Sequence, residues 1–65
     1  MDNGQVMSYL VREISKLRDE NAAFIAAGRA DGYEEYRHVC GIIRGLNFAE
    51  NIIEDLVRKM EKADE

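Results

Sequence analysis

The chain has 65 residues, of which 46% are hydrophobic and 34% charged, with no proline, one cysteine and a net charge of −4. This length supports one small domain with a thin margin of stability, because about 60 residues bury only about 60% of the surface exposed on unfolding. One cysteine excludes a disulfide within the chain. The acidic balance disfavours nucleic-acid binding, which needs an excess of basic side chains to neutralise phosphates.

The sequence also lacks the features of an exported or membrane-spanning protein. Its most apolar stretch, residues 39–57, contains Arg44, Glu50, Glu54 and Asp55, so we expect no membrane-spanning helix. No basic flank followed by an apolar run is present near the N-terminus, so we expect no secretory signal. Together with the lone thiol, this indicates a reducing, intracellular compartment.

A first helix is predicted over residues 5–27, after a frayed start at residues 1–4. Its apolar residues recur at alternating spacings of three and four, which is typical of a helix that presents a narrow stripe to another helix. The stripe consists of Met7, Leu10, Ile14, Leu17, Asn21 and Phe24. Asn21 is either a half-exposed amide near the helix end or a buried amide that fixes register and oligomeric state.

A turn is predicted at residues 28–31. Gly28 directly follows the apolar pattern and suits the left-handed position that ends many helices. Asp31 stands three residues before Glu34, which resembles a capping box for the next helix. A connection this short joins antiparallel neighbours.

A second helix is predicted over residues 32–62, with an apolar stripe of Val39, Ile42, Leu46, Ala49, Ile53, Leu56, Met60 and Ala63. Further apolar residues flank this stripe and make it wider than one partner helix can cover. We therefore predict an all-α fold, a single domain over residues 1–65 formed by an antiparallel two-helix hairpin that oligomerises into a helical bundle. The residues assigned to the interface are Tyr36, Ile43, Phe48, Ile52, Leu56 and Met60.

Small residues at positions i, i+4 and i+8 predict close packing of the second helix, at Gly41, Gly45 and Ala49. A glycine inside a helix costs about 1 kcal/mol relative to alanine, so two of them need a reason. Close approach of another backbone is one, and the first helix offers small residues at Ala22, Ala23, Ala26 and Ala27.

The reactive residue types form no recognisable site. His38 and Cys40 are two residues apart on a helix and point about 200° apart, so they cannot share a ligand. Glu35 and His38 match once the Glu-x-x-His string of di-metal carboxylate bundles, which needs a second copy. We therefore predict no catalytic, metal or cofactor site and no enzymatic activity. Glu50 falls close to the apolar side and would need a partner if buried.

The segment Glu35–Leu46, which follows Asp31-Gly32-Tyr33, resembles a pattern in short uncharacterised helical proteins of tailed bacteriophages. The resemblance covers residues 17–58 approximately and includes a charged first helix that ends in small residues. The second helix of those proteins has a YxxxCGxIRGL-like sequence, matched here from Tyr36 to Leu46. The resemblance implies a phage origin, with the virion or its assembly machinery as one place of action, and it carries over no catalytic residue.

Two functions are compatible with these features, and both require a protein partner and no cofactor. The first is a structural or assembly protein, a minor virion, connector or scaffolding-type component in the infected bacterium's cytoplasm or in the virion. It would form a homo-oligomer or dock on a larger viral protein. The second is a small regulatory protein that inhibits a host enzyme by laying one helix into a groove.

Overall fold

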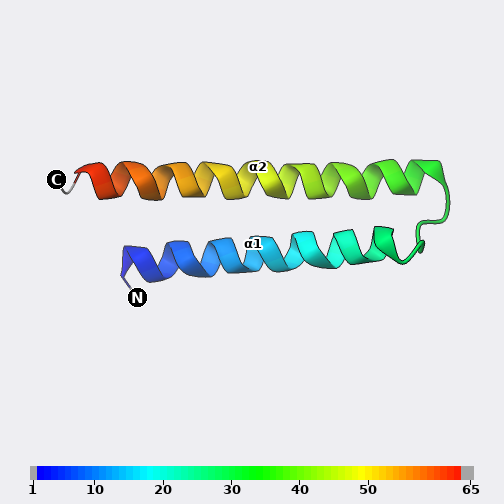
Figure 1. Ribbon diagram of the computed structural model, residues 1–65, viewed down its shortest axis with the longest axis horizontal. Coiled ribbons are helices and arrows are strands. Elements are labelled where there is room, and N and C mark those ends of the chain that lie inside the picture. Colours follow the sequence, from blue (N-terminus) through cyan, green and yellow to red (C-terminus); the bar gives the residue numbers. More distant parts are fainter. Residues whose placement is uncertain (1, 64–65) are drawn as a thin grey trace.

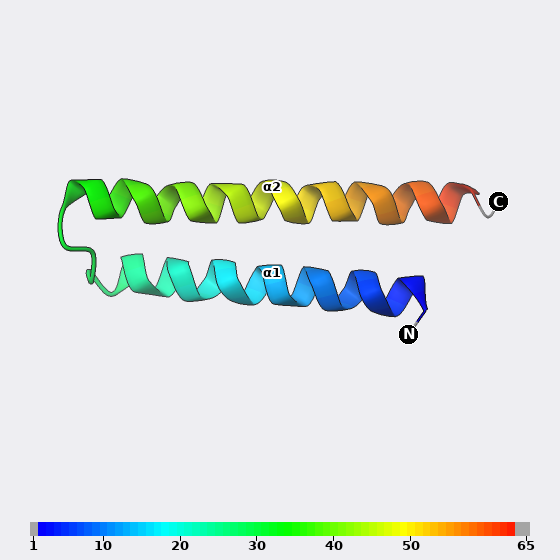
Figure 2. The ribbon, with the colours of Figure 1, turned by 180° about the vertical axis from the view of Figure 1, so that it is seen from behind.

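The structure, a computed structural model, describes residues 2–63 and confirms the all-helical hairpin. Helices α1 (Asn3–Ala26) and α2 (Tyr33–Ala63) lie side by side in opposite directions and are joined by a short turn (Figure 1). The view from behind shows the same two-helix layer, in which the end of α2 extends beyond the start of α1 (Figure 2).

Helix α1 begins at Asn3, two residues before the predicted start, and the expected fraying of residues 2–4 is wrong. The Gln5 N–H donates to Asp2 Oδ1 at 2.7 Å, and the Asp2 N–H donates to Gln5 Oε1 at 3.2 Å. This reciprocal capping box satisfies two of the donors that a helix start leaves without partners. An N-cap aspartate with glutamine three residues later therefore fixes the start of the helix.

The end of α1 confirms the predicted role of Gly28, which has a φ of 70°. The Gly28 N–H donates to the Ile25 carbonyl at 3.0 Å, and the Arg29 N–H donates to the Phe24 carbonyl at 3.2 Å. This pair of bonds is the Schellman arrangement, in which a left-handed glycine stops the helix and satisfies its last carbonyls.

The start of α2 differs from the prediction. Gly32 has a φ of 144°, and its carbonyl accepts the N–H of Tyr36 at 3.0 Å. Gly32 therefore precedes the first helical residue, and the expected capping box of Asp31 and Glu34 is wrong. Within residues 2–63, the Asp31 carboxylate accepts no hydrogen bond.

The hairpin encloses almost no core. Among the residues described, Val39 is the only buried hydrophobic residue, with 7% of its surface exposed. The molecule measures 50 × 18 × 13 Å, and its radius of gyration is 15.1 Å. A compact chain of this length has a radius of gyration of about 11 Å. Two helices side by side cover only one side of each other, which leaves most apolar residues in contact with solvent.

Neither of the two helices in the described part of the chain is apolar enough over a sufficient length to cross a bilayer.

Candidate interaction surface

The sides on which the two helices meet are identified by one direct contact. Arg18 Nη1 of α1 donates to Glu50 Oε2 of α2 at 2.6 Å. Residues three, four or seven positions away from these two share their sides of the helices. The buried and half-buried residues that recur along these two sides form a set that we call the seam: Met7, Val11, Ile14, Arg18, Asn21 and Ile25 on α1, and Val39, Ile43, Leu46, Glu50, Ile53, Val57 and Met60 on α2.

The seam is rotated relative to the predicted stripes. Leu10 and Leu17 of α1, and Ile42 and Leu56 of α2, were expected to face the other helix but are exposed. The apolar pattern omitted Arg18 and Glu50 from the contact because they are charged, whereas they pair with each other inside it. The predicted position of Ala63 cannot be compared, because its side chain lies outside the described residues.

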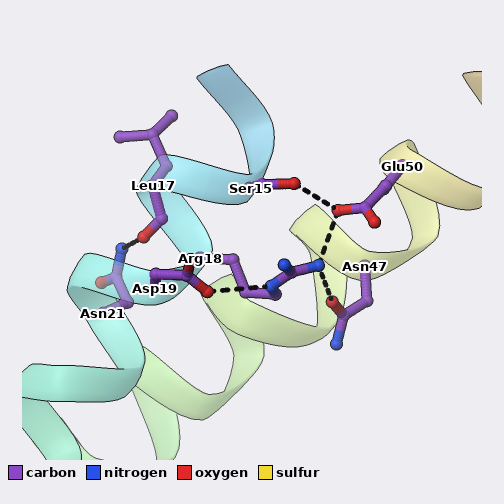
Figure 3. A network of polar contacts seen from close by, with 7 residues as sticks. All are labelled: Ser15, Leu17, Arg18, Asp19, Asn21, Asn47 and Glu50. Atoms are coloured by element: carbon purple, nitrogen blue, oxygen red, sulfur yellow. Dashed lines mark hydrogen bonds and ion pairs between the residues drawn. The ribbon is translucent and has the colours of Figure 1, made fainter. Parts of the chain in front are cut away.

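A polar network crosses the middle of the seam (Figure 3). Ser15 Oγ also donates to Glu50 Oε2, at 3.1 Å, and Arg18 Nη1 donates to Asn47 Oδ1 at 3.4 Å. Arg18 Nε donates to Asp19 Oδ1 at 3.5 Å. The Glu50 side chain is 18% exposed and that of Arg18 is 28% exposed. The prediction that a buried Glu50 would need a partner is thus confirmed, since a carboxylate removed from water must be paired or hydrogen-bonded.

Asn21 is half-buried in the seam, but its amide does not bridge the helices. Its Nδ2 donates to the carbonyl of Leu17 in the same helix at 2.7 Å (Figure 3). This contact fits the first of the two interpretations, a half-exposed amide near the helix end.

A second apolar stripe, exposed except at Phe24 and Ala49, follows each helix beside the seam. Each member directly precedes a seam residue and therefore lies about 100° around the helix from it. Because the helices are antiparallel, the same sense of rotation brings both stripes to the same side of the hairpin. We call this side the apolar face; it consists of Val6, Leu10, Leu17 and Phe24 on α1, and Ile42, Gly45, Ala49, Ile52 and Leu56 on α2.

The charged and polar positions of the apolar face differ between the helices. The residues that precede Ile14 and Asn21 on α1 are Glu13 and Glu20, both acidic. The corresponding residues at the two ends of the α2 stripe are His38 and Lys59. The acidic side chains of the apolar face therefore lie on α1, whereas α2 contributes Lys59 and no acidic side chain to it.

The opposite side of the hairpin has a different chemistry. The residues that directly follow seam residues are mostly polar or small, and we call this side the polar face: Ser8, Arg12, Ser15, Asp19, Ala22 and Ala26 on α1, and Cys40, Arg44, Asn47, Asn51, Glu54, Arg58 and Glu61 on α2. A groove of about 690 Å³ lies on this side, between the start of α1 and the last turns of α2. Arginine and glutamate side chains alternate along it, so it favours neither a cation nor an anion.

The residues assigned to the interface from the sequence divide among these surfaces. Ile43 and Met60 lie in the seam, whereas Ile52 and Leu56 lie on the apolar face. Tyr36 and Phe48 are exposed outside it. The Tyr36 ring stacks on Tyr33 with a centroid distance of 6.4 Å, and the Arg44 guanidinium lies 5.7 Å from the centre of the Phe48 ring.

The prediction that α1 closely approaches the glycines of α2 is wrong within the hairpin. A Cβ built at Gly41 or Gly45 would meet no neighbouring atom within 4 Å. The four alanines near the end of α1 are likewise exposed: Ala22, Ala23, Ala26 and Ala27. Neither glycine is therefore required by contact between the two helices.

Cys40 is a free, half-buried thiol, and His38 is exposed. Hydrogen bonding with Cys40, and then the negative charge of the thiolate, raises the pKa of the Tyr36 hydroxyl. Among residues 2–63, no group of three or more histidine, cysteine, aspartate and glutamate side chains is placed to hold a metal ion.

Comparison with protein-family models, curated proteins and solved structures gives no match for this chain. The resemblance of residues 35–46 to phage proteins therefore stays a prediction.

Proposed function

We propose that this chain is a non-enzymatic assembly protein that acts through helix–helix contacts made by its apolar face. The exposure of that face carries the proposal. Half of the Leu17 surface and 68% of the Ile52 surface are exposed, in a chain with a single buried hydrophobic residue among those described. Contiguous apolar surface of this kind, bordered by charged residues, is typical of a site where another protein binds.

We extend the proposal to phage assembly, as a minor virion, connector or scaffolding-type component. This extension depends on the resemblance of residues 35–46 alone. Detection of the chain in purified virions or assembly intermediates by mass spectrometry would support it.

Site-specific photo-crosslinking in the cells that produce the protein tests whether the apolar face makes protein contacts. A benzophenone side chain is placed at Ile52, on the apolar face, or at the neighbouring exposed Asn51, on the polar face. We expect covalent protein adducts from position 52 and few from position 51. Equal yields at both positions, or none at position 52, would refute the proposal. Adducts to a bacterial enzyme alone would favour the regulatory function instead.

A further inference from the structure

We propose that the partner of the apolar face is a second copy of this chain, which packs with its turn at the same end to form a four-helix bundle. In this arrangement α1 of each chain lies over α2 of the other. This inference names the partner in the proposed function and rests on it.

The exposed area matches what such a dimer requires. The chain exposes 5221 Å² and has a mass of 7.4 kDa. A folded monomer of that mass exposes about 4,200 Å², so the hairpin has an excess of about 1,000 Å². A stable protein–protein interface of standard size removes about 800 Å² from each partner. One equivalent hairpin on the apolar face therefore covers the excess.

The acidic side chains of the apolar face disfavour one of the two orientations of the second copy. With both turns at one end, α1 of each chain, which carries Glu13 and Glu20 on its apolar face, lies over α2 of the partner, which carries no acidic side chain on that face. With the turns at opposite ends, α1 meets α1 and α2 meets α2, so like charges face each other. Like-charge juxtaposition suppresses the second arrangement.

Side-chain size is complementary in the same orientation. A two-fold axis parallel to the helices permits no sliding, so residues at one height in the hairpin stay at that height in the dimer. Ser15 contacts Glu50 and Arg18 contacts Asn47, which places Leu17 level with residue 48. Each Leu17 would therefore face the space beside Gly45 and Ala49 of the other chain. That space is open in the hairpin, since a Cβ at Gly45 meets nothing within 4 Å.

The oligomeric state is tested by light scattering and sedimentation with matched variants of the full chain. Leu17 and Tyr9 are both 50% exposed, but only Leu17 lies on the apolar face. We expect a mass of two chains, a dissociation constant raised by about a hundred-fold or more in Leu17→Glu, and little change in Tyr9→Glu. If Leu17→Glu loses its helical circular dichroism, Gly45→Leu replaces it, because the hairpin has room for that side chain. A monomeric parent, or a dimer that both apolar-face variants leave intact, would overturn the inference.

The orientation is tested by oxidation of single-cysteine variants in a Cys40→Ala background. A disulfide requires Cα atoms within about 7 Å, which neighbouring helices of a bundle reach and diagonal helices do not. When the Leu17→Cys and Ala49→Cys variants are mixed and oxidised, we expect a disulfide between residue 17 of one chain and residue 49 of the other. When either variant is oxidised alone, we expect no disulfide-linked dimer. A symmetrical Ala49→Cys disulfide would place the turns at opposite ends. A contrary result would be photo-crosslinking at position 52 that gives adducts with other proteins and none of twice the chain mass. That result would refute a second copy as the partner while supporting the proposed function.

Discussion

The ion pair between Arg18 and Glu50 provides a direct test of the seam. It joins residues that are 32 positions apart, and both side chains are largely removed from water. We consider three variants: Arg18→Leu, Glu50→Leu and the double substitution. Each single change leaves one charged group without its partner between aliphatic neighbours, whereas the double change removes both charges and adds apolar surface.

The expected magnitudes follow from what each remaining group can still contact. Without Arg18, the Glu50 carboxylate keeps only the Ser15 hydroxyl, which we expect to cost about 2 kcal/mol, less than the 3–5 kcal/mol of a fully buried pair. Without Glu50, the longer Arg18 side chain still reaches Asp19 and solvent, so we expect a cost of about 1 kcal/mol. The double variant should lie within about 1 kcal/mol of the parent, which gives a coupling free energy of about 2–4 kcal/mol.

The measurement is urea unfolding and thermal unfolding, both followed by circular dichroism, at one fixed protein concentration because self-association would add to stability. Each kcal/mol should shift the melting temperature by about 4–8 °C in a chain of this size. The control is the pair of Asp55 and Arg58, whose side chains are 58% and 67% exposed and should couple by less than about 0.5 kcal/mol. If the effects of the Arg18 and Glu50 substitutions are additive, their coupling free energy is as small as that of the control pair. This result would show that the two helices do not meet as described.

Four further substitutions test the local structure by thermal unfolding. Gly28→Ala should destabilise the chain by about 1–2 kcal/mol because φ is 70° there, whereas Gly41→Ala should stabilise it by about 1 kcal/mol in an open helical position. Shifts of the same sign would contradict this contrast. Asp2→Ala should cost about 1 kcal/mol through loss of the bond to Gln5, and an unchanged melting temperature would exclude the capping box. Val39→Ala should cost about 2 kcal/mol, since it removes the one buried hydrophobic side chain described; a loss below about 0.5 kcal/mol would mean that this site is exposed in solution.

The helices and the end of α1 could be predicted because their signals are local in the sequence. Alternating spacings of three and four define a helix wherever it lies, and a glycine directly after such a pattern suits the left-handed stop seen at Gly28. The start of α1 was equally local, since Asp2 and Gln5 form a capping box. The prediction missed it because the first apolar residues of the helix, Val6 and Met7, follow this capping box, and the predicted start lies next to them.

The identity of the inner side could not be predicted from periodicity. Helix α2 has two apolar stripes about 100° apart, one through Ile43 and Val57 and the other through Ile42 and Leu56. Both have helical spacing, and the sequence pattern combined them into a single wide surface. The choice between them depends on the contact of Glu50 with α1, which is a tertiary interaction rather than a property of either helix.

A partner on the apolar face would also account for two features of α2 that its own hairpin does not explain. Gly45 lowers helix stability without admitting a neighbouring backbone or side chain, and Ile52 is more exposed than any other large aliphatic residue described. Natural sequences accept such local costs where another part of the structure compensates for them. Both residues lie on the same side of the molecule and within two helical turns of each other. A helix packed over that side would bury Ile52 and fill the space at Gly45. One contact would then compensate for both the exposed apolar side chain and the helical glycine.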